Sequence, residues 1–177
     1  MMEQLKNYFF NKAIESAKQS FSSDRPSEKK QLLCVMDVND IDSSNLIKIT
    51  KDHFKTADYE IYFLFHWSKL SEKMEGVNVH FYSNKRVSWF GGLNKLNEYE
   101  CLDNQYDLVI YPQSHYRKDF EFISRVVNAK LQVGSVENLD RYNLDLALDC
   151  QSKDLSKFYR QLKNYFPRLF SIKTSSN

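Results

Sequence analysis

The stretch Gln31-Leu-Leu-Cys-Val-Met36, with Asp37-Val-Asn-Asp40 directly after it, decides the fold class of this chain. It is a short, mostly apolar run, and it lacks the polar alternation of a strand with one face in water. Such a strand is typically buried on both faces, as in a parallel sheet with helices on either side. The polar residues that follow predict a turn into a helix, with Asp40 or Asp42 as its capping residue.

Strands and helices continue to alternate toward the C-terminus. Short apolar runs predict strands over residues 59–65, 77–82, 107–111, 129–133 and 144–148. Apolar residues at helical spacing predict helices over residues 43–56 and 118–128, and a last helix that Ser152 caps and Pro167 ends. This alternation predicts an α/β fold: a three-layer sandwich around a mostly parallel, Rossmann-like sheet of about five or six strands.

The N-terminal part of the chain predicts one further helix. Over residues 2–21, apolar residues recur at helical spacing, at Leu5, Phe9, Ile14, Ala17 and Phe21. The polar stretch from Ser22 to Lys30 contains a proline and is typical of a linker. We therefore expect an amphipathic helical arm at residues 1–22, a single α/β domain at 31–170 and a disordered tail at 171–177.

This arm is the predicted contact with other proteins. We expect it to pack on its own domain, or to bind a second copy of the chain or a partner protein. Binding to a membrane surface is the less favoured alternative, because Glu3 and Glu15 lie on its polar face.

Composition excludes several classes of function. The 25 Lys and Arg against 23 Asp and Glu in 177 residues leave a net charge of +2, too even for a nucleic-acid-binding groove. No apolar run reaches the roughly 18 residues of a membrane span, and no secretory signal is evident. Cys34, Cys101 and Cys150 are far apart in the sequence, which favours a reducing, cytoplasmic compartment.

Topology predicts where a ligand would bind. In a doubly wound sheet of order 3-2-1-4-5-6, the order reverses between the strands at 31–36 and 107–111, and ligands bind beyond the carboxyl ends there. The candidate ligand-binding residues at or after the strand ends are Asp37, Asn39, Asp40, Gln113, Ser114, Gly134 and Ser135. Trp89 is a further candidate, because it could form an aromatic lip over the sheet edge. Asp37 and His115 are the candidate catalytic residues, as an acid–base pair if their loops meet.

No cofactor and no metal site is predicted. The turn after the first strand holds three carboxylates and no glycine, so it would repel the pyrophosphate of a dinucleotide. A magnesium site built from this turn and Asp149 is the alternative, because Mg²⁺ takes oxygen ligands. His53, His66 and His80 have no ligand spacing and are expected to be structural.

The stretch Ser88-Trp-Phe-Gly-Gly92 holds half of the glycines in the chain. It predicts a turn with positive φ and a buried Trp89. The alternative is that Trp89 forms an aromatic lip over the sheet edge. Before it, Val87-Ser-Trp-Phe90 is expected to pair back across Asn84-Lys85 as a hairpin.

Two resemblances follow from longer segments. The chain resembles a small family of uncharacterised bacterial proteins with no assigned function. The segments that carry this resemblance are the basic N-terminal helix, Ser88-Trp-Phe-Gly91, Tyr106-Asp-Leu-Val-Ile110 and Asn128-Ala-Lys-Leu-Gln-Val-Gly134. Residues 107–134 alone are similar to the acceptor half of heptosyltransferase-like glycosyltransferases. That similarity implies binding of sugar nucleotides between two Rossmann-like halves, of which this chain is long enough for one.

These observations favour a non-catalytic α/β domain that binds a partner or a small ligand. No G-x-S-x-G elbow or other catalytic motif is evident in the sequence. The alternative is an enzyme that acts on a nucleotide or sugar-nucleotide substrate. That alternative requires Asp37, Asn39 and His115 to converge on one cleft.

Overall fold

Strand β1 (Lys30–Asp37) lies inside the sheet, as its apolar sequence predicts. A computed structural model describes residues 2–21, 29–39, 43–55, 57–69, 75–76, 78–149, 155–165 and 167. The seven strands of the main sheet, in spatial order, are β3 (Glu75–Gly76), β4 (Val79–Tyr82), β2 (Tyr59–His66), β1, β6 (Leu108–Tyr111), β8 (Gln132–Ser135) and β9 (Leu146–Leu148). All neighbours pair in parallel except β3 with β4. The six parallel strands therefore have the predicted 3-2-1-4-5-6 order, and the predicted fold class is confirmed.

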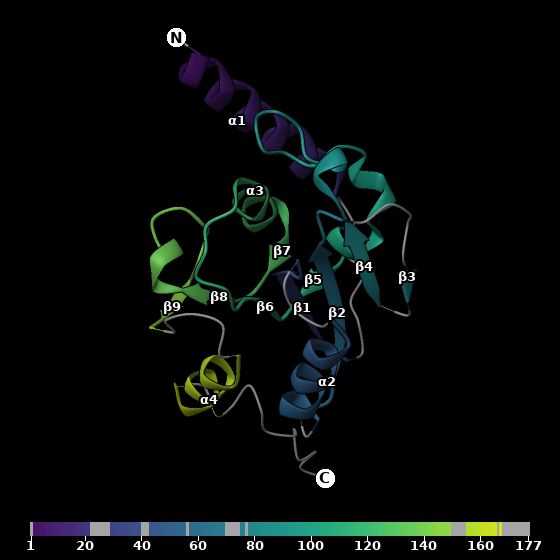
Figure 1. Ribbon diagram of the computed structural model, residues 1–177, viewed down its shortest axis with the longest axis vertical. Coiled ribbons are helices and arrows are strands. Elements are labelled where there is room, and N and C mark those ends of the chain that lie inside the picture. Colours follow the sequence, from purple (N-terminus) through teal and green to yellow (C-terminus); the bar gives the residue numbers. More distant parts are fainter. Residues whose placement is uncertain are drawn as a thin grey trace.

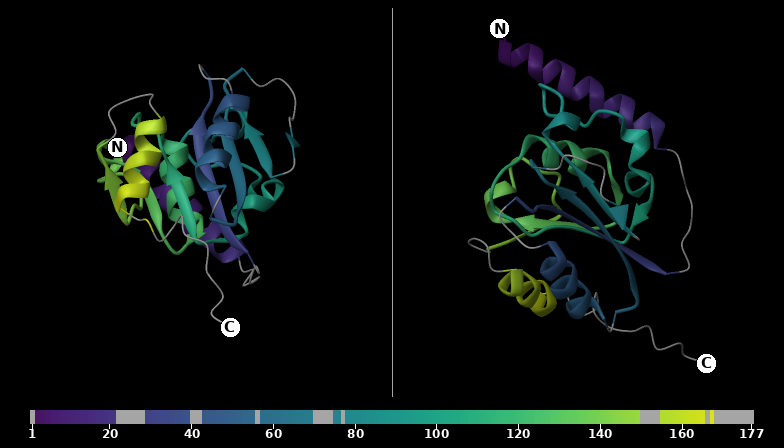
Figure 2. Two further views of the ribbon diagram at one scale, coloured as in Figure 1. Left: turned by 90° about the horizontal axis from the view of Figure 1, so that it is seen from below. Right: turned by 45° about the vertical axis from the view of Figure 1, so that its right-hand side comes forward.

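Helices cover both faces of this sheet (Figure 1). Helices α2 (Ser43–Phe54) and α4 (Leu155–Tyr165) lie on one face, and α3 (Lys118–Val126) lies on the other (Figure 2). Alternate residues of β1 enter the two cores, because side chains along a strand point to opposite faces. Leu32, Cys34 and Met36 pack with α2 and α4, and Leu33 and Val35 pack on the side of α3.

Helix α1 (Met2–Ser20) forms an additional layer outside α3 (Figure 2). Its buried residues are Phe10, Ile14 and Ala17, and the Phe10 ring meets that of Phe122 at 6.0 Å between centroids. The predicted helix is confirmed. Of its apolar residues at helical spacing, Ile14 and Ala17 are buried, whereas Leu5 and Phe9 are exposed. Phe10, one position after Phe9, fills the contact with α3 in place of Phe9.

The C-terminal half of the predicted sheet differs in one place. The predicted strand at 129–133 is split into β7 (Asn128–Ala129) and β8. Strand β7 pairs with β5 (Gln105–Tyr106) in a separate two-stranded sheet. The Lys130 N–H then donates to the Tyr106 carbonyl at 2.9 Å, so the chain turns before it joins β6.

The segment after β4 corrects two predictions. Asn84–Arg86 form a 3₁₀ turn and Val87 pairs with Leu93, so the predicted hairpin across residues 84–85 is wrong. Gly91 has the predicted positive φ, at 97°, and a Cβ there would lie 2.1 Å from Cγ of Lys118. Trp89 is 57% exposed, so the prediction that it is buried is also wrong.

Several predictions concern residues outside the described ranges. They include the capping residues Asp40, Asp42 and Ser152, most of the linker, Cys150 and the tail at 171–177. Among the helices that the structure describes, none has the length and apolarity to cross a membrane.

Candidate functional site

The carboxyl ends of β1, β2 and β4 place three polar side chains in one row. Their last residues, Asp37, His66 and Tyr82, are direct partners in the parallel register. Because side chains alternate along a strand, this row shares the sheet face of Val35 and Leu64, which lies on the side of α3. His66 and Tyr82 are buried. The row therefore reaches the point where the strand order reverses, facing the start of α3.

The start of α3 supplies an arginine to this row. Arg117 directly precedes the helix and Asp119 lies in its first turn. The Arg117 guanidinium donates to Oδ2 of Asp37 at 2.9 Å, and to Asp119 through Nε at 3.1 Å and Nη2 at 3.0 Å. Tyr82 donates its hydroxyl hydrogen to Oδ2 of Asp119 at 2.7 Å. One arginine thus joins carboxylates from β1 and α3.

His115 forms the outer edge of this network. Its Nε2 lies 3.6 Å from Oδ2 of Asp37, the oxygen that Arg117 also contacts. The His115 side chain is 52% exposed, against 11% for Asp37. The structure therefore brings the two candidate catalytic residues together, because the loops after β1 and β6 meet. An imidazole beside a buried carboxylate can bind a polar ligand or transfer a proton.

The donors around Asp37 keep its carboxylate charged. Burial alone would raise the pKa of Asp37, since the charged form loses hydration. Contacts with His115 and His66 and the 3.0 Å hydrogen bond from the Asn39 N–H outweigh burial and hold this pKa well below its ordinary value. Burial opposes charge on Arg117, but the nearby carboxylates outweigh it and raise the pKa of Arg117. Both groups are therefore charged at neutral pH.

Asn39 and His66 connect the turns that follow β1 and β2. His66 Nε2 lies 2.9 Å from Oδ1 of Asn84. The other ring nitrogen, Nδ1, faces Asp37 at 3.4 Å. Asn39 donates to Asp37 through Nδ2 and accepts from the Ser68 N–H at 2.6 Å. Two of the candidate ligand-binding residues, Asp37 and Asn39, are thus in direct contact.

Gln113 fastens the end of β1 to the loop after β6. Its Oε1 accepts from the Asp37 N–H at 2.7 Å, and its Nε2 donates to the Asp37 carbonyl at 2.6 Å. One side chain therefore satisfies both backbone groups of Asp37, which need partners when buried. This geometry gives Gln113 a positioning role at the site.

Two other predicted residues lie in the same loops or on β8 without joining the network. The Ser114 carbonyl accepts from Nδ2 of Asn138 at 3.1 Å. Ser135 donates its hydroxyl hydrogen to Glu137. Both contacts hold the loops that surround the edge of the sheet.

The remaining predicted residues are placed elsewhere. A Cβ at Gly134 would lie 2.8 Å from the Leu144 side chain, so this glycine allows close packing. Trp89 packs against Phe9 of α1, at 5.9 Å between ring centroids, rather than against Asp37. Asp40 lies outside the described residues.

Two carboxylates of the alternative magnesium site, Asp40 and Asp42, lie outside the described residues. Asp149 follows β9, which is three strands away from β1 in the sheet. Among the residues that the structure describes, no three His, Cys, Asp or Glu side chains are grouped as a metal site requires.

Four members of the network were not among the predicted site residues. His66 was expected to be structural, and Tyr82, Arg117 and Asp119 were not singled out. One signal was available for the strand residues: in a parallel register, His66 and Tyr82 are the terminal residues with the same facing as Asp37. For Arg117 and Asp119 the sequence shows only charges at a helix start, which are common.

Acidification is expected to destabilise the protein partly through Asp37. In the unfolded chain its carboxyl binds a proton near pH 3.9, but in the folded chain it stays charged to lower pH. As the pH falls below about 5, the unfolded state therefore binds more protons, and the free energy of unfolding decreases. Asp37→Asn should lose less stability than the wild type between pH 6 and pH 3 in urea titrations. Asp140→Asn, at an exposed carboxylate, should follow the wild type, and equal slopes for all three proteins would contradict the expectation.

Comparison with known proteins identifies one family. A sequence model of that family matches residues 3–169 of the chain. No curated protein and no solved structure matches the chain. The similarity of residues 107–134 to heptosyltransferase-like glycosyltransferases has no match to support it and stays a prediction. The chain belongs to DUF6913, a family of unknown function.

Proposed function

We propose that this protein binds a small polar ligand at the carboxyl edge of its sheet, where β1 and β6 meet. The observation that carries the proposal is the contact between His115 and Asp37, which leaves His115 half exposed at the reversal point of the strand order. Open α/β sheets bind ligands at this point. Asp37 and Arg117 fix the inner side of the site, and His115 presents a donor or acceptor to the ligand.

A thermal-shift screen tests this proposal. The panel holds nucleotides, nucleotide sugars and phosphorylated metabolites, and a ligand at about 100 times its Kd adds about 2.7 kcal/mol of stability. We expect one class to raise the Tm of the wild type and of His53→Ala, whose histidine stacks on Tyr159 on the other sheet face. The same ligand should leave the Tm of His115→Ala unchanged. A ligand that shifts all three proteins equally would place its site elsewhere.

An enzyme is the second candidate function. The pairing of His115 with a buried carboxylate is the arrangement of a general acid or base, and Asn39 also contacts Asp37. An enzyme that acts on a nucleotide or sugar nucleotide would require Asp37, Asn39 and His115 to converge on one cleft, and these contacts bring the three side chains together. Mass spectrometry of a ligand incubated with the protein distinguishes the candidates: turnover that His115→Gln abolishes favours the enzyme, and an unchanged ligand favours binding alone.

We also propose that the N-terminal helix contacts a second copy of the chain. Five exposed apolar side chains of α1 and the neighbouring turn form this surface: Met2, Leu5, Tyr8, Phe9 and Trp89. Rings of this size bury about 150–250 Å² each, so two such surfaces would bury on the order of 1,000 Å² together. Weak, reversible dimers have interfaces of this size.

Sedimentation over a range of concentrations tests this contact. The wild type should show a mass that rises with concentration. The double variant Leu5→Ser with Tyr8→Ser should remain a monomer, and Leu139→Ser, at an exposed leucine outside this surface, should behave as the wild type. A wild type that is monomeric throughout, or a double variant that still associates, contradicts the proposal.

The cysteines support a reducing compartment, and we propose a cytoplasmic location on this basis. Cys34 and Cys101 are free and buried, one in each core. Burial raises the pKa of both thiols to about 12, so they stay protonated and unreactive.

A further inference from the structure

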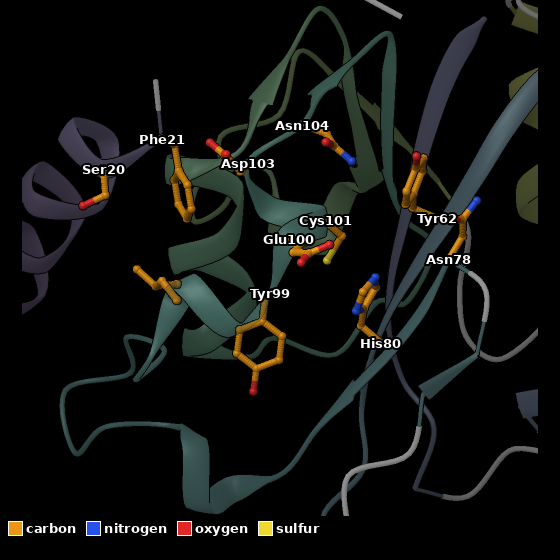
Figure 3. Close-up of a pocket in the computed structure, with 11 residues that line it drawn as sticks. Ser20, Phe21, Tyr62, Asn78, His80, Tyr99, Glu100, Cys101, Asp103 and Asn104 are labelled. Atoms are coloured by element: carbon orange, nitrogen blue, oxygen red, sulfur yellow. The ribbon is translucent and has the colours of Figure 1, made fainter. Parts of the chain in front are cut away.

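A cavity of about 880 Å³ lies on the α3 side of the sheet, apart from the network around Asp37. It is bordered by the end of α1, by β2 and β4, and by the segment from Leu96 to Asn104 (Figure 3). It shares no lining residue with the Asp37 network. Its volume lies within the range of about 300–1,000 Å³ that small-molecule sites have.

The charges on the cavity wall are acidic. Glu100 and Asp103 line it together with the imidazole of His80, and among the described residues that line it there is no Lys or Arg. A third carboxylate, Glu60, accepts from Nδ2 of the lining Asn78 at 3.5 Å. A wall of this composition attracts cations and repels phosphates and carboxylates.

Aromatic rings form the other part of the wall. The cavity is lined by Phe21, which directly follows α1, by Tyr62 of β2 and by Tyr99 of the segment from Leu96 to Asn104 (Figure 3). Two of these rings are held by edge contacts with buried tyrosines: Tyr62 by Tyr106 at 5.7 Å and Tyr99 by Tyr82 at 6.1 Å. Burial raises the pKa of Tyr99 to about 12, so its ring stays a neutral phenol. Rings held in place in this way can receive a cation without losing further side-chain freedom.

We propose that this cavity binds a small molecule that carries an alkylated ammonium group. Aromatic faces attract such a cation, and carboxylates at the same wall balance its charge. An alkylated ammonium is also weakly hydrated and has few N–H groups that would need hydrogen-bond partners beside the rings of this wall. The cationic group would lie between the Tyr62 and Tyr99 rings and the carboxylate of Glu100, which is exposed at the cavity.

Calorimetric titration of the full chain with choline tests this assignment. Its neutral carbon isostere, 3,3-dimethyl-1-butanol, has nearly the same shape without the charge. We expect saturable binding of choline and none of the isostere. Glu100→Gln and Tyr99→Leu should each weaken choline binding by about 3- to 30-fold, the range expected for one cation contact. Tyr99→Phe keeps the ring and should bind as the wild type does.

Two further variants complete the test. Glu15→Gln, at an exposed carboxylate of α1, should bind choline as the wild type does. His115→Ala should also bind it normally, so failure of the function proposed for the edge of the sheet would leave this result unaffected. Equal binding of choline and its isostere, absence of choline binding, or unchanged affinity in folded Glu100→Gln and Tyr99→Leu would each overturn the assignment.

Discussion

Methionine in place of Arg117 is expected to lower the free energy of unfolding by about 3–5 kcal/mol. The guanidinium joins Asp37 and Asp119, whose side chains are only 11% and 4% exposed. Without it, two carboxylates stay buried close together with no cation between them. Urea denaturation at pH 7 measures the loss. Lysine at this position should restore only part of it, because an ammonium cannot make the forked contact with Asp119.

Arg125 provides a matched control on the same helix. It pairs with Glu121 at 2.9 Å, but its side chain is 41% exposed. Its partner Glu121 is only 9% exposed, but Glu121 also pairs with Lys118 at 3.2 Å. Arg125→Met therefore leaves that carboxylate with a cation and should cost only about 1 kcal/mol. Similar losses of unfolding free energy in Arg117→Met and Arg125→Met would contradict the expectation that the network around Asp37 stabilises the fold more than the pair at Arg125 does.

Phe10→Ala is expected to lower the free energy of unfolding by about 3 kcal/mol or more. Phe10 is 2% exposed, its ring contacts Phe122 of α3, and the Lys118 ammonium lies 4.0 Å above it. Its truncation leaves a cavity between α1 and α3 and removes this cation–π contact. Chemical denaturation measures the change, and a loss of helical circular dichroism before the main transition would show α1 detaching first.

An exposed residue of the same helix tests whether burial against α3 explains the loss of stability expected for Phe10→Ala. Leu5→Ala, at a side chain that is 50% exposed on the same helix, should change stability by less than about 0.5 kcal/mol. Equal effects at Leu5 and Phe10 would mean that α1 is not docked through the Phe10 face. A near-zero effect at both would support the expectation of a separate arm.

The fold could be predicted from local sequence because burial on both faces leaves a plain signal. The run at residues 32–36 is apolar throughout, and such a strand belongs between helices in a parallel sheet. The alternation of strands and helices then restricts the strand order to a few arrangements. The split of residues 129–133 into β7 and β8 was not predictable in this way, because a two-residue strand has too few side chains to show a period.

The candidate site was predictable only in part. Topology places Asp37 and His115 at the same edge of the sheet, and they lie 3.6 Å apart there. The orientation of α1 shows the opposite case: Phe9 and Phe10 are adjacent and chemically alike, but one is exposed and the other buried. Sequence spacing identifies a helix with an apolar side, and the contact with α3 selects which residues fill it.

The sequence by itself therefore determined the class of fold, the central position of β1 and the edge where polar loops gather. Those features depend on composition and on short-range periodicity. Tertiary structure alone decided that Arg117 bridges Asp37 and Asp119. It also decided that the rings and carboxylates of the cavity at the end of α1 share one wall. Strand register and helix packing bring these residues together. The contact between Arg117 and Asp37, for example, spans 80 positions, and no local pattern in the sequence records it.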